Sequence, residues 1–209
     1  MLNNQIQNMK SFLLSALSII IIFSFQACGE HETDPVPATV PADPIDPQEA
    51  FFETLSSLCG ETFIGEATYP ENTDHPLVGT ELRTHVSECN ESMVRIELIR
   101  DGDYWHGAWV VERREDGLHL FHDHLGDVRT LETLGEDDSH GYGGYATDEG
   151  TATVQYFAAD AVTEEMIPEA STNVWMMELD LENETFIYYL ERNSEPRFRA
   201  ELNKVEEEV

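Results

Sequence analysis

The pattern of apolar and polar positions changes from helical to strand-like near residue 60. Between Gln48 and Leu58 the apolar side chains recur at the spacing of one helix face: Phe51, Phe52, Leu55 and Leu58. A face of this kind predicts an amphipathic helix. Asp46-Pro47 supplies a cap and a first turn, and Gly60 follows as a stop signal. One short helix is therefore expected before the main part of the chain.

Beyond the helix, short runs rich in β-branched and aromatic residues alternate with turn signals such as Glu115-Asp116-Gly117. They predict strands near 61–68, 80–88, 93–100, 105–113, 118–124, 151–157, 173–181, 185–191 and 197–203. Short turns favour an antiparallel meander, and about eight or nine such strands close into an up-and-down barrel. A β-sandwich is the alternative. Residues 141–145 fall in the longest irregular stretch, and one further helical turn is expected at Thr163–Ile167.

The first 27 residues have the order of a secretory signal. Lys10 precedes an apolar run from Phe12 to Phe25, and Ala27 comes directly before Cys28. The run is shorter than the roughly 20 residues of a membrane-spanning helix. The segment Phe25-Gln26-Ala27-Cys28 resembles a bacterial lipobox, which implies a lipoprotein signal peptide over 1–27 and lipidation of Cys28. The implied location is the cell envelope, as an outer membrane lipoprotein of a Gram-negative bacterium.

Residues 28–47 are acidic and carry five of the nine prolines, with almost no large apolar side chain. Such a composition cannot bury a core and favours extended segments. This part is expected to tether the domain that follows. Residues 48–209 are long enough to bury an ordinary core and are expected to form one β-barrel domain.

Two cysteines remain once Cys28 is assigned to lipid. An even pair in an oxidising compartment predicts a disulfide between Cys59 and Cys89. Closing a loop of that length restricts the unfolded chain by about 3.5 kcal/mol. Two free buried thiols are the alternative, and a metal pair is disfavoured because no CxxC spacing occurs.

The formal net charge of the chain is −31, from 42 acidic residues against 11 Lys and Arg. A surface of that charge repels phosphate backbones, so no nucleic-acid partner is expected. The simplest interpretation is solubility rather than specific cation binding.

The segment Leu118 to His124 carries the most suggestive chemistry. Strand alternation puts Leu118, Leu120, His122 and His124 on one face, so the histidines point inward if the leucines do. Two histidines at this spacing can bind one metal ion when another strand supplies a third ligand. His85 and His106 are candidates for that ligand. The alternative is a hydrogen-bonded polar lining near a barrel mouth.

No G-x-S-x-G, H-E-x-x-H, P-loop or Rossmann motif occurs, so no reaction is assigned. The later strands are rich in aromatic and thioether side chains, which are expected to pack a core or to line an apolar cavity. Arg83, Arg95 and Arg100 could bind an acidic head group in such a cavity, or could be exposed charges.

Several local patterns resemble an uncharacterised family of short exported bacterial proteins, secreted or lipid-anchored, with a lipocalin-like look. They are Leu58-Cys59-Gly60, Phe63-x-Gly65, Leu82-x-x-His85-Val86-x-x-Cys89, Asp116-Gly117-Leu118, His122-Asp123-His124, Gly150-Thr151-Ala152-Thr153 and Thr172-Asn173-Val174-Trp175-x-Met177-Glu178. The resemblance implies that both cysteines, His85 and the His-Asp-His segment belong to the family pattern. It implies no activity.

Three functions are consistent with these features. The leading expectation is a membrane-anchored, lipocalin-like barrel that binds a small apolar or amphipathic ligand near His122 and His124. A metal-dependent enzyme that uses these histidines is the second, although no cofactor is firmly indicated. A non-catalytic envelope or surface interaction protein with a solid barrel is the third.

Overall fold

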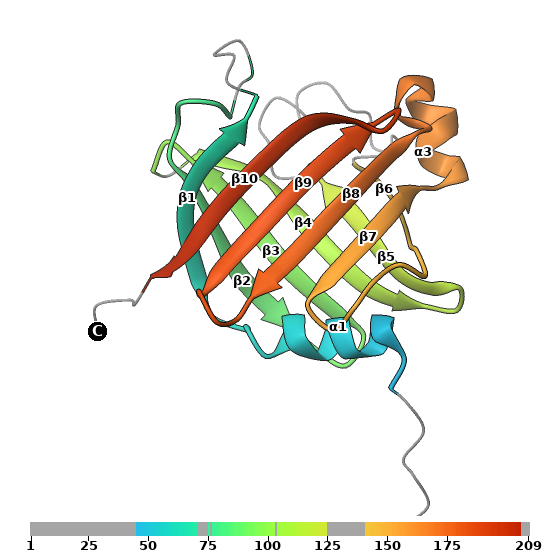
Figure 1. Cartoon of the computed structure of the whole chain (residues 1–209), viewed down its shortest axis with the longest axis horizontal. Helices are drawn as coiled ribbons and strands as arrows, with labels where there is room; N and C mark the ends of the chain where they lie inside the picture. The colour runs from blue at the N-terminus through green and yellow to red at the C-terminus, as the bar shows by residue number, and fades with distance from the viewer. Residues whose placement is uncertain (1–44, 71–74, 76, 103, 125–140, 206–209) are drawn as a thin grey trace, which may run out of the picture. The chain divides into compact units, whose positions relative to one another are not determined.

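The computed structural model describes residues 45–70, 75, 77–102, 104–124 and 141–205. Within them, ten antiparallel strands form a closed barrel in which neighbours follow chain order and β1 pairs with β10 (Figure 1). The strands are β1 (Thr62–Tyr69), β2 (Leu82–Cys89), β3 (Met93–Arg100), β4 (Tyr104–Arg114), β5 (Gly117–Asp123), β6 (Gly141–Ala146), β7 (Val154–Ala159), β8 (Asn173–Asp180), β9 (Thr185–Arg192) and β10 (Glu195–Val205). The predicted up-and-down barrel is confirmed, with ten strands instead of eight or nine, and the β-sandwich alternative is wrong.

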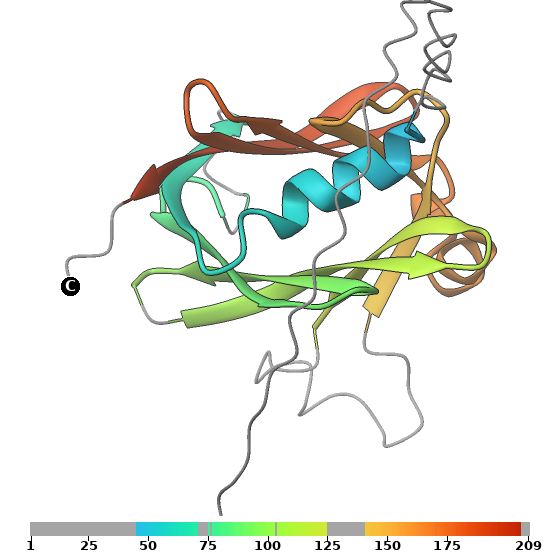
Figure 2. The ribbon, with the colours of Figure 1, turned by 90° about the horizontal axis from the view of Figure 1, so that it is seen from below.

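Helix α1 (Pro47–Ser56) lies across one end of the barrel (Figure 2). The Asp46 carboxylate caps it by accepting hydrogen bonds from the backbone N–H of Gln48 at 2.8 Å and of Glu49 at 3.4 Å. Gln48 in turn accepts the backbone N–H of Leu118 at 3.0 Å, which fixes the helix to the start of β5. The buried residues of α1 are Phe51, Phe52 and Leu55, as the helical spacing predicts. This helix closes the barrel end at which it lies.

The predicted disulfide between Cys59 and Cys89 is present, with the two Cα atoms 6.1 Å apart. It joins the segment after α1 to the end of β2. The bridge therefore holds the connection to the closing helix against the barrel wall.

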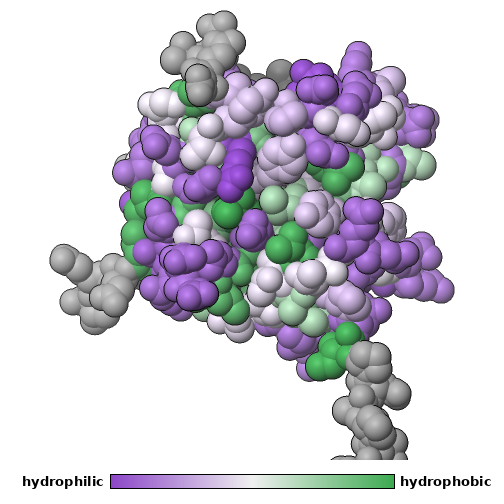
Figure 3. Space-filling model, viewed as in Figure 1, coloured by the Kyte–Doolittle hydropathy of each residue, from purple (hydrophilic) through white to green (hydrophobic). Residues whose placement is uncertain are grey.

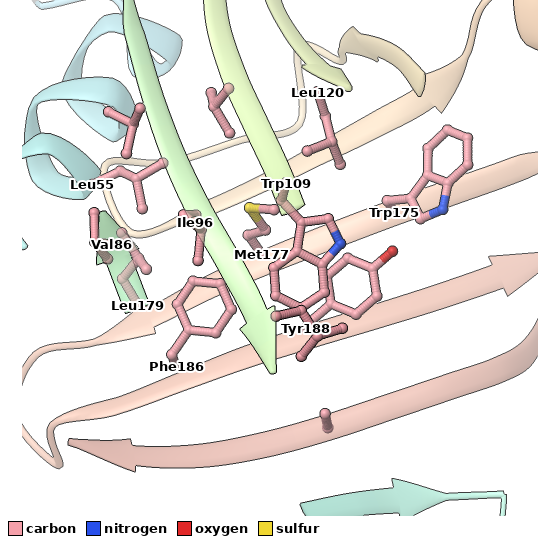
Figure 4. Packing of buried hydrophobic residues seen from close by; sticks show 14 of the residues in the cluster. Leu55, Val86, Ile96, Trp109, Leu120, Trp175, Met177, Leu179, Phe186 and Tyr188 are labelled. Carbon is pink, nitrogen blue, oxygen red and sulfur yellow. The ribbon is translucent and has the colours of Figure 1, made fainter. Parts of the chain in front are cut away.

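The strands alternate between a buried and a more exposed face, as β8 does along its whole length. The outward-facing side chains are mostly polar, so the molecular face shown in Figure 3 is mostly hydrophilic. Inward positions form a continuous core inside the barrel, which Figure 4 shows in part. The largest fully buried side chains include Phe51, Phe52, Leu55, Phe157, Trp175, Met177, Leu179 and Phe186.

Strand β6 is the element that sequence analysis missed, because residues 141–145 contain three glycines and glycine is depleted in strands. The structure shows why they are needed. A Cβ atom at Gly143 would lie 1.9 Å from the backbone oxygen of Leu120, and one at Gly144 would lie 1.8 Å from that of Ala158. Close approach of the neighbouring strands therefore requires glycine at both positions.

Helix α3 (Ala161–Met166) is bound to the outer side of β5 and β6, where the further helical turn was expected; the 3₁₀ turn η1 (Pro168–Ala170) follows it. The Asp160 carboxylate caps α3 and also contacts Nε2 of the buried His119 at 2.9 Å. Thr163 Oγ1 donates to the carbonyl of Gly143 at 2.7 Å and accepts its N–H at 2.8 Å. His119 is thus buried outside the barrel, on the opposite face of β5 from His122.

The leader at 1–27, the proposed lipid site at Cys28 and most of the 28–47 tether lie outside the described residues. Among the residues that are described, no helix is long and apolar enough to cross a membrane.

A histidine-lined cavity at the open end of the barrel

A cavity of about 190 Å³ lies inside the barrel at the end opposite α1. Helix α1 contacts Leu118 at the start of β5, whereas His122 and His124 at the end of β5 line the cavity. The helix and the cavity therefore lie at opposite ends of the barrel. The lining residues are His75, Leu77, Leu98, His106, Gly107, Ala108, Trp109, His122, His124, Tyr142, Tyr188, Leu190 and Phe198. Several of these residues, such as Trp109 and Phe198, also belong to the buried core of the barrel.

Three aromatic side chains form one inward row across β4, β5 and β6. His122 lies directly opposite Trp109 on one side and opposite Tyr142 on the other. Its ring stacks on Tyr142 with centroids 5.0 Å apart and meets Trp109 edge-on at 6.3 Å. Trp175 of β8 approaches the same imidazole at 5.4 Å. His122 is thus enclosed by rings, as the alternation of β5 predicts for a residue on the face of Leu118 and Leu120.

Tyr188 of β9 reaches His122 across the barrel, with 3.0 Å between its hydroxyl oxygen and Nε2. Trp109 stacks on the Tyr188 ring at 4.3 Å. A phenol hydroxyl is a stronger donor than a neutral imidazole N–H, and an imidazole nitrogen is the stronger acceptor, so we assign the proton of this contact to Tyr188. In this assignment the imidazole carries its own proton on Nδ1. Figure 4 shows Trp109 and Tyr188 together above Phe186.

Three further histidines lie around this centre. His124 follows β5 and its ring lies 6.4 Å from that of His122 and 5.4 Å from that of Tyr142. His106 lies where the pairing of β3 with β4 is irregular, beyond the regular pair Leu98 and Gly107. His75, from the connection between β1 and β2, stacks on Phe198 at 5.0 Å. Four imidazoles therefore border one small space.

Burial keeps the central groups uncharged near neutral pH. It lowers the pKa of His122 well below the usual 6.5, and the nearby His124 and His106 lower it further. Burial also raises the pKa of Tyr188 well above the usual 10, and it raises the pKa of Tyr142. The pKa of His75 is lowered by burial as well. No Asp, Glu, Lys or Arg occurs among the described residues that line the cavity.

His85 does not belong to this group, although the sequence made it a candidate ligand beside His122 and His124. It lies on β2 between the buried Thr84 and Val86, so alternation turns it to the outer face. There its Nδ1 contacts the hydroxyl of Thr62 at 3.0 Å. The histidine that joins His122 and His124 is His106, the other candidate.

The three arginines considered for an acidic head group do not line the cavity. Arg95 lies on the outer face, where it pairs with Glu97 at 2.6 Å and with Asp123 at 2.7 Å. Asp123, which lies between His122 and His124 in the sequence, is therefore part of an ion-pair cluster on the outer face of the barrel.

The cavity histidines do not form a preassembled metal site. Within the described ranges, no group of three or more His, Cys, Asp or Glu side chains is placed to hold one ion. The described lining also contains no Ser or Cys nucleophile and no carboxylic acid. What this arrangement offers is apolar contact, ring stacking and a few neutral hydrogen-bonding groups, which suit binding.

Comparison of the sequence and the structure with known proteins identifies no relative of this chain. No family model, curated protein or solved structure matches the chain.

Sequence reasoning missed His75 and Tyr142 as cavity residues. His75 lies in a connection that carries no strand pattern, and Tyr142 lies among the glycines of β6. Tyr188 is one of the aromatic side chains of the later strands that were expected to pack a core or to line a cavity, but its contact with His122 depends on closure of the barrel. The one available signal was the β4–β5 turn, which places Trp109 opposite His122.

Proposed function

We propose that this protein is a lipid-anchored envelope protein whose barrel binds a small ligand in the histidine-lined cavity. The observation that carries the proposal is the cavity itself, a mostly apolar space that contains a few convergent polar groups. Strongly perturbed pKa values, such as those of His122 and Tyr188, are typical of functional sites. The cavity is continuous with the core of the barrel, because Leu98, Trp109 and Tyr188 belong to both.

The lipid anchor is proposed from the leader and Cys28. Membership of the family of exported bacterial proteins that the local patterns resemble is a separate proposal from the sequence. Two or more lipid chains hold a protein stably on a membrane. A Cys28→Ala variant expressed in a Gram-negative host is expected to leave the membrane fraction and to lose labelling by radioactive palmitate. Membrane association that survives this change would refute the anchor without affecting the cavity.

Ligand binding is tested by native mass spectrometry of the full chain, purified gently in mild detergent without chelator. The expected result is excess mass over the denatured, reduced protein. Leu190→Trp should abolish that excess, because Leu190 lines the cavity and a larger ring there fills the space. Val174→Trp is the matched control, because Val174 precedes the inward-facing Trp175 and lies on the outer face of β8.

A bare mass for the wild-type chain, together with no saturable binding of any small molecule, would refute the binding function. The interaction-protein alternative would then be favoured. Excess mass that persists in Leu190→Trp would place the bound molecule elsewhere.

A further inference from the structure

The cavity has room for about one ring. Its volume is about 190 Å³. An apolar protein cavity of roughly 150 Å³ is known to bind benzene. A long acyl chain or a tetrapyrrole does not fit a space of this size. The available volume suits a single ring with one or two small substituents.

The walls favour a flat molecule. Three pairs of lining rings already lie face to face: Trp109 with Tyr188 at 4.3 Å, His122 with Tyr142 at 5.0 Å and His75 with Phe198 at 5.0 Å. Aromatic rings attract one another in offset stacked or edge-to-face arrangements. A planar aromatic guest continues these stacks, whereas a branched aliphatic guest of equal volume makes no such contact.

The described lining of the cavity contains no carboxylate, ammonium or guanidinium group. The charge of Arg192 on β9 acts on the Tyr142 hydroxyl, but Arg192 is not part of that lining. The titratable groups that face His122 are His106 of β4, His124 after β5, Tyr142 of β6 and Tyr188 of β9, with His75 from the β1–β2 connection. A full charge buried without a partner is costly, so an uncharged guest is favoured.

One polar group at the centre is suited to contact the guest. In the assigned tautomer the Tyr188 hydroxyl donates to Nε2 of His122, 3.0 Å away, which leaves the Nδ1–H of the same imidazole as the donor that His122 presents. The complementary group on a guest is a hydrogen-bond acceptor, such as a hydroxyl or carbonyl oxygen.

We propose that the ligand is an uncharged, single-ring aromatic molecule with one hydrogen-bond acceptor, stacked between the rings of the cavity and bound by His122. This inference rests on the proposed function and narrows its ligand class. It differs from the sequence-based expectation of an apolar or amphipathic ligand by excluding fatty acids.

The test is a charge series of similar size, titrated at pH 7.5 into the full chain in mild detergent by isothermal calorimetry. Benzyl alcohol is the neutral probe, benzoate the anion, benzylammonium the cation, and toluene lacks the acceptor. Decanoate represents an acyl chain. Benzyl alcohol is expected to bind at least about tenfold more tightly than each of the others, as one lost buried interaction of about 1.4 kcal/mol implies.

Three variants locate the effect. His122→Phe keeps a ring but removes the donor, so benzyl alcohol should lose about tenfold in affinity while toluene is unchanged. His85→Phe on the outer wall is the matched control and should bind like wild type, because His85 does not line the cavity. Leu190→Trp should bind none of the probes.

Tighter binding of benzoate, benzylammonium or decanoate, lost in Leu190→Trp, would overturn the ligand class and leave the proposed function intact. Equal binding of benzyl alcohol and toluene would refute the role of His122. Absence of binding by every probe refutes the ligand class, and combined with a bare native mass it refutes the proposed function too.

Discussion

Removing the hydroxyl of Tyr188 tests the hydrogen bond at the centre of the cavity. Tyr188→Phe retains the ring that stacks on Trp109, so the main loss is the 3.0 Å contact to His122 Nε2. A buried acceptor left without its donor costs about 1–3 kcal/mol of unfolding free energy. The expected destabilisation lies in that range, since both residues are enclosed by the barrel.

Tyr189→Phe provides a control at the next position along β9. Its hydroxyl points outward and makes only a 3.5 Å contact with Glu191, so a change below about 0.5 kcal/mol is expected. Urea unfolding, followed by tryptophan fluorescence and by circular dichroism, measures both variants against wild type. Equal stability of the two variants, or a more stable Tyr188→Phe protein, would refute the hydrogen-bond argument.

Three further predictions concern stability. Replacing Cys59 and Cys89 together by Ser should lower the free energy of unfolding by about 2–5 kcal/mol, and a loss below 1 kcal/mol in urea unfolding would contradict a stabilising bridge. Gly143→Ala should destabilise the protein by about 1–3 kcal/mol or more, because its Cβ would lie 1.9 Å from a backbone oxygen; wild-type stability would refute the close approach. Stability should also fall as pH drops below 6.5, because the unfolded imidazole of His122 binds a proton there and the folded one, with its lowered pKa, does not. The slope for this group is at most about 1.4 kcal/mol per pH unit until the folded group also titrates, and His122→Phe should reduce it.

Much of the fold could be predicted because its signals are local. The apolar face of α1, its cap at Asp46 and the alternation along β5 depend on residues close in sequence. The alternation alone placed His122 on the same face as Leu118 and Leu120, which are buried. The disulfide followed from cysteine number and compartment, not from geometry.

The candidate site could be predicted only in part because its contacts are distant in sequence. His85 is an exception, because the local alternation of Thr84 and Val86 already turns it to the outer wall. The hydrogen bond from Tyr188 to His122 requires the curvature and closure of the whole barrel. The glycines of β6 resemble a loop unless the close backbone of β5 is known.

Closure between β1 and β10 has a consequence for how the chain reaches its native state. Thr62 pairs with Val205 and Ala67 pairs with Ala200, so the first strand completes its hydrogen bonds only with the last. Contacts between such distant segments carry a large loop-closure cost and make folding slow, on the order of milliseconds to seconds. A nascent chain that ends before β10 leaves both β1 and β9 with an open edge, so these strands are the sites at which incomplete molecules would associate.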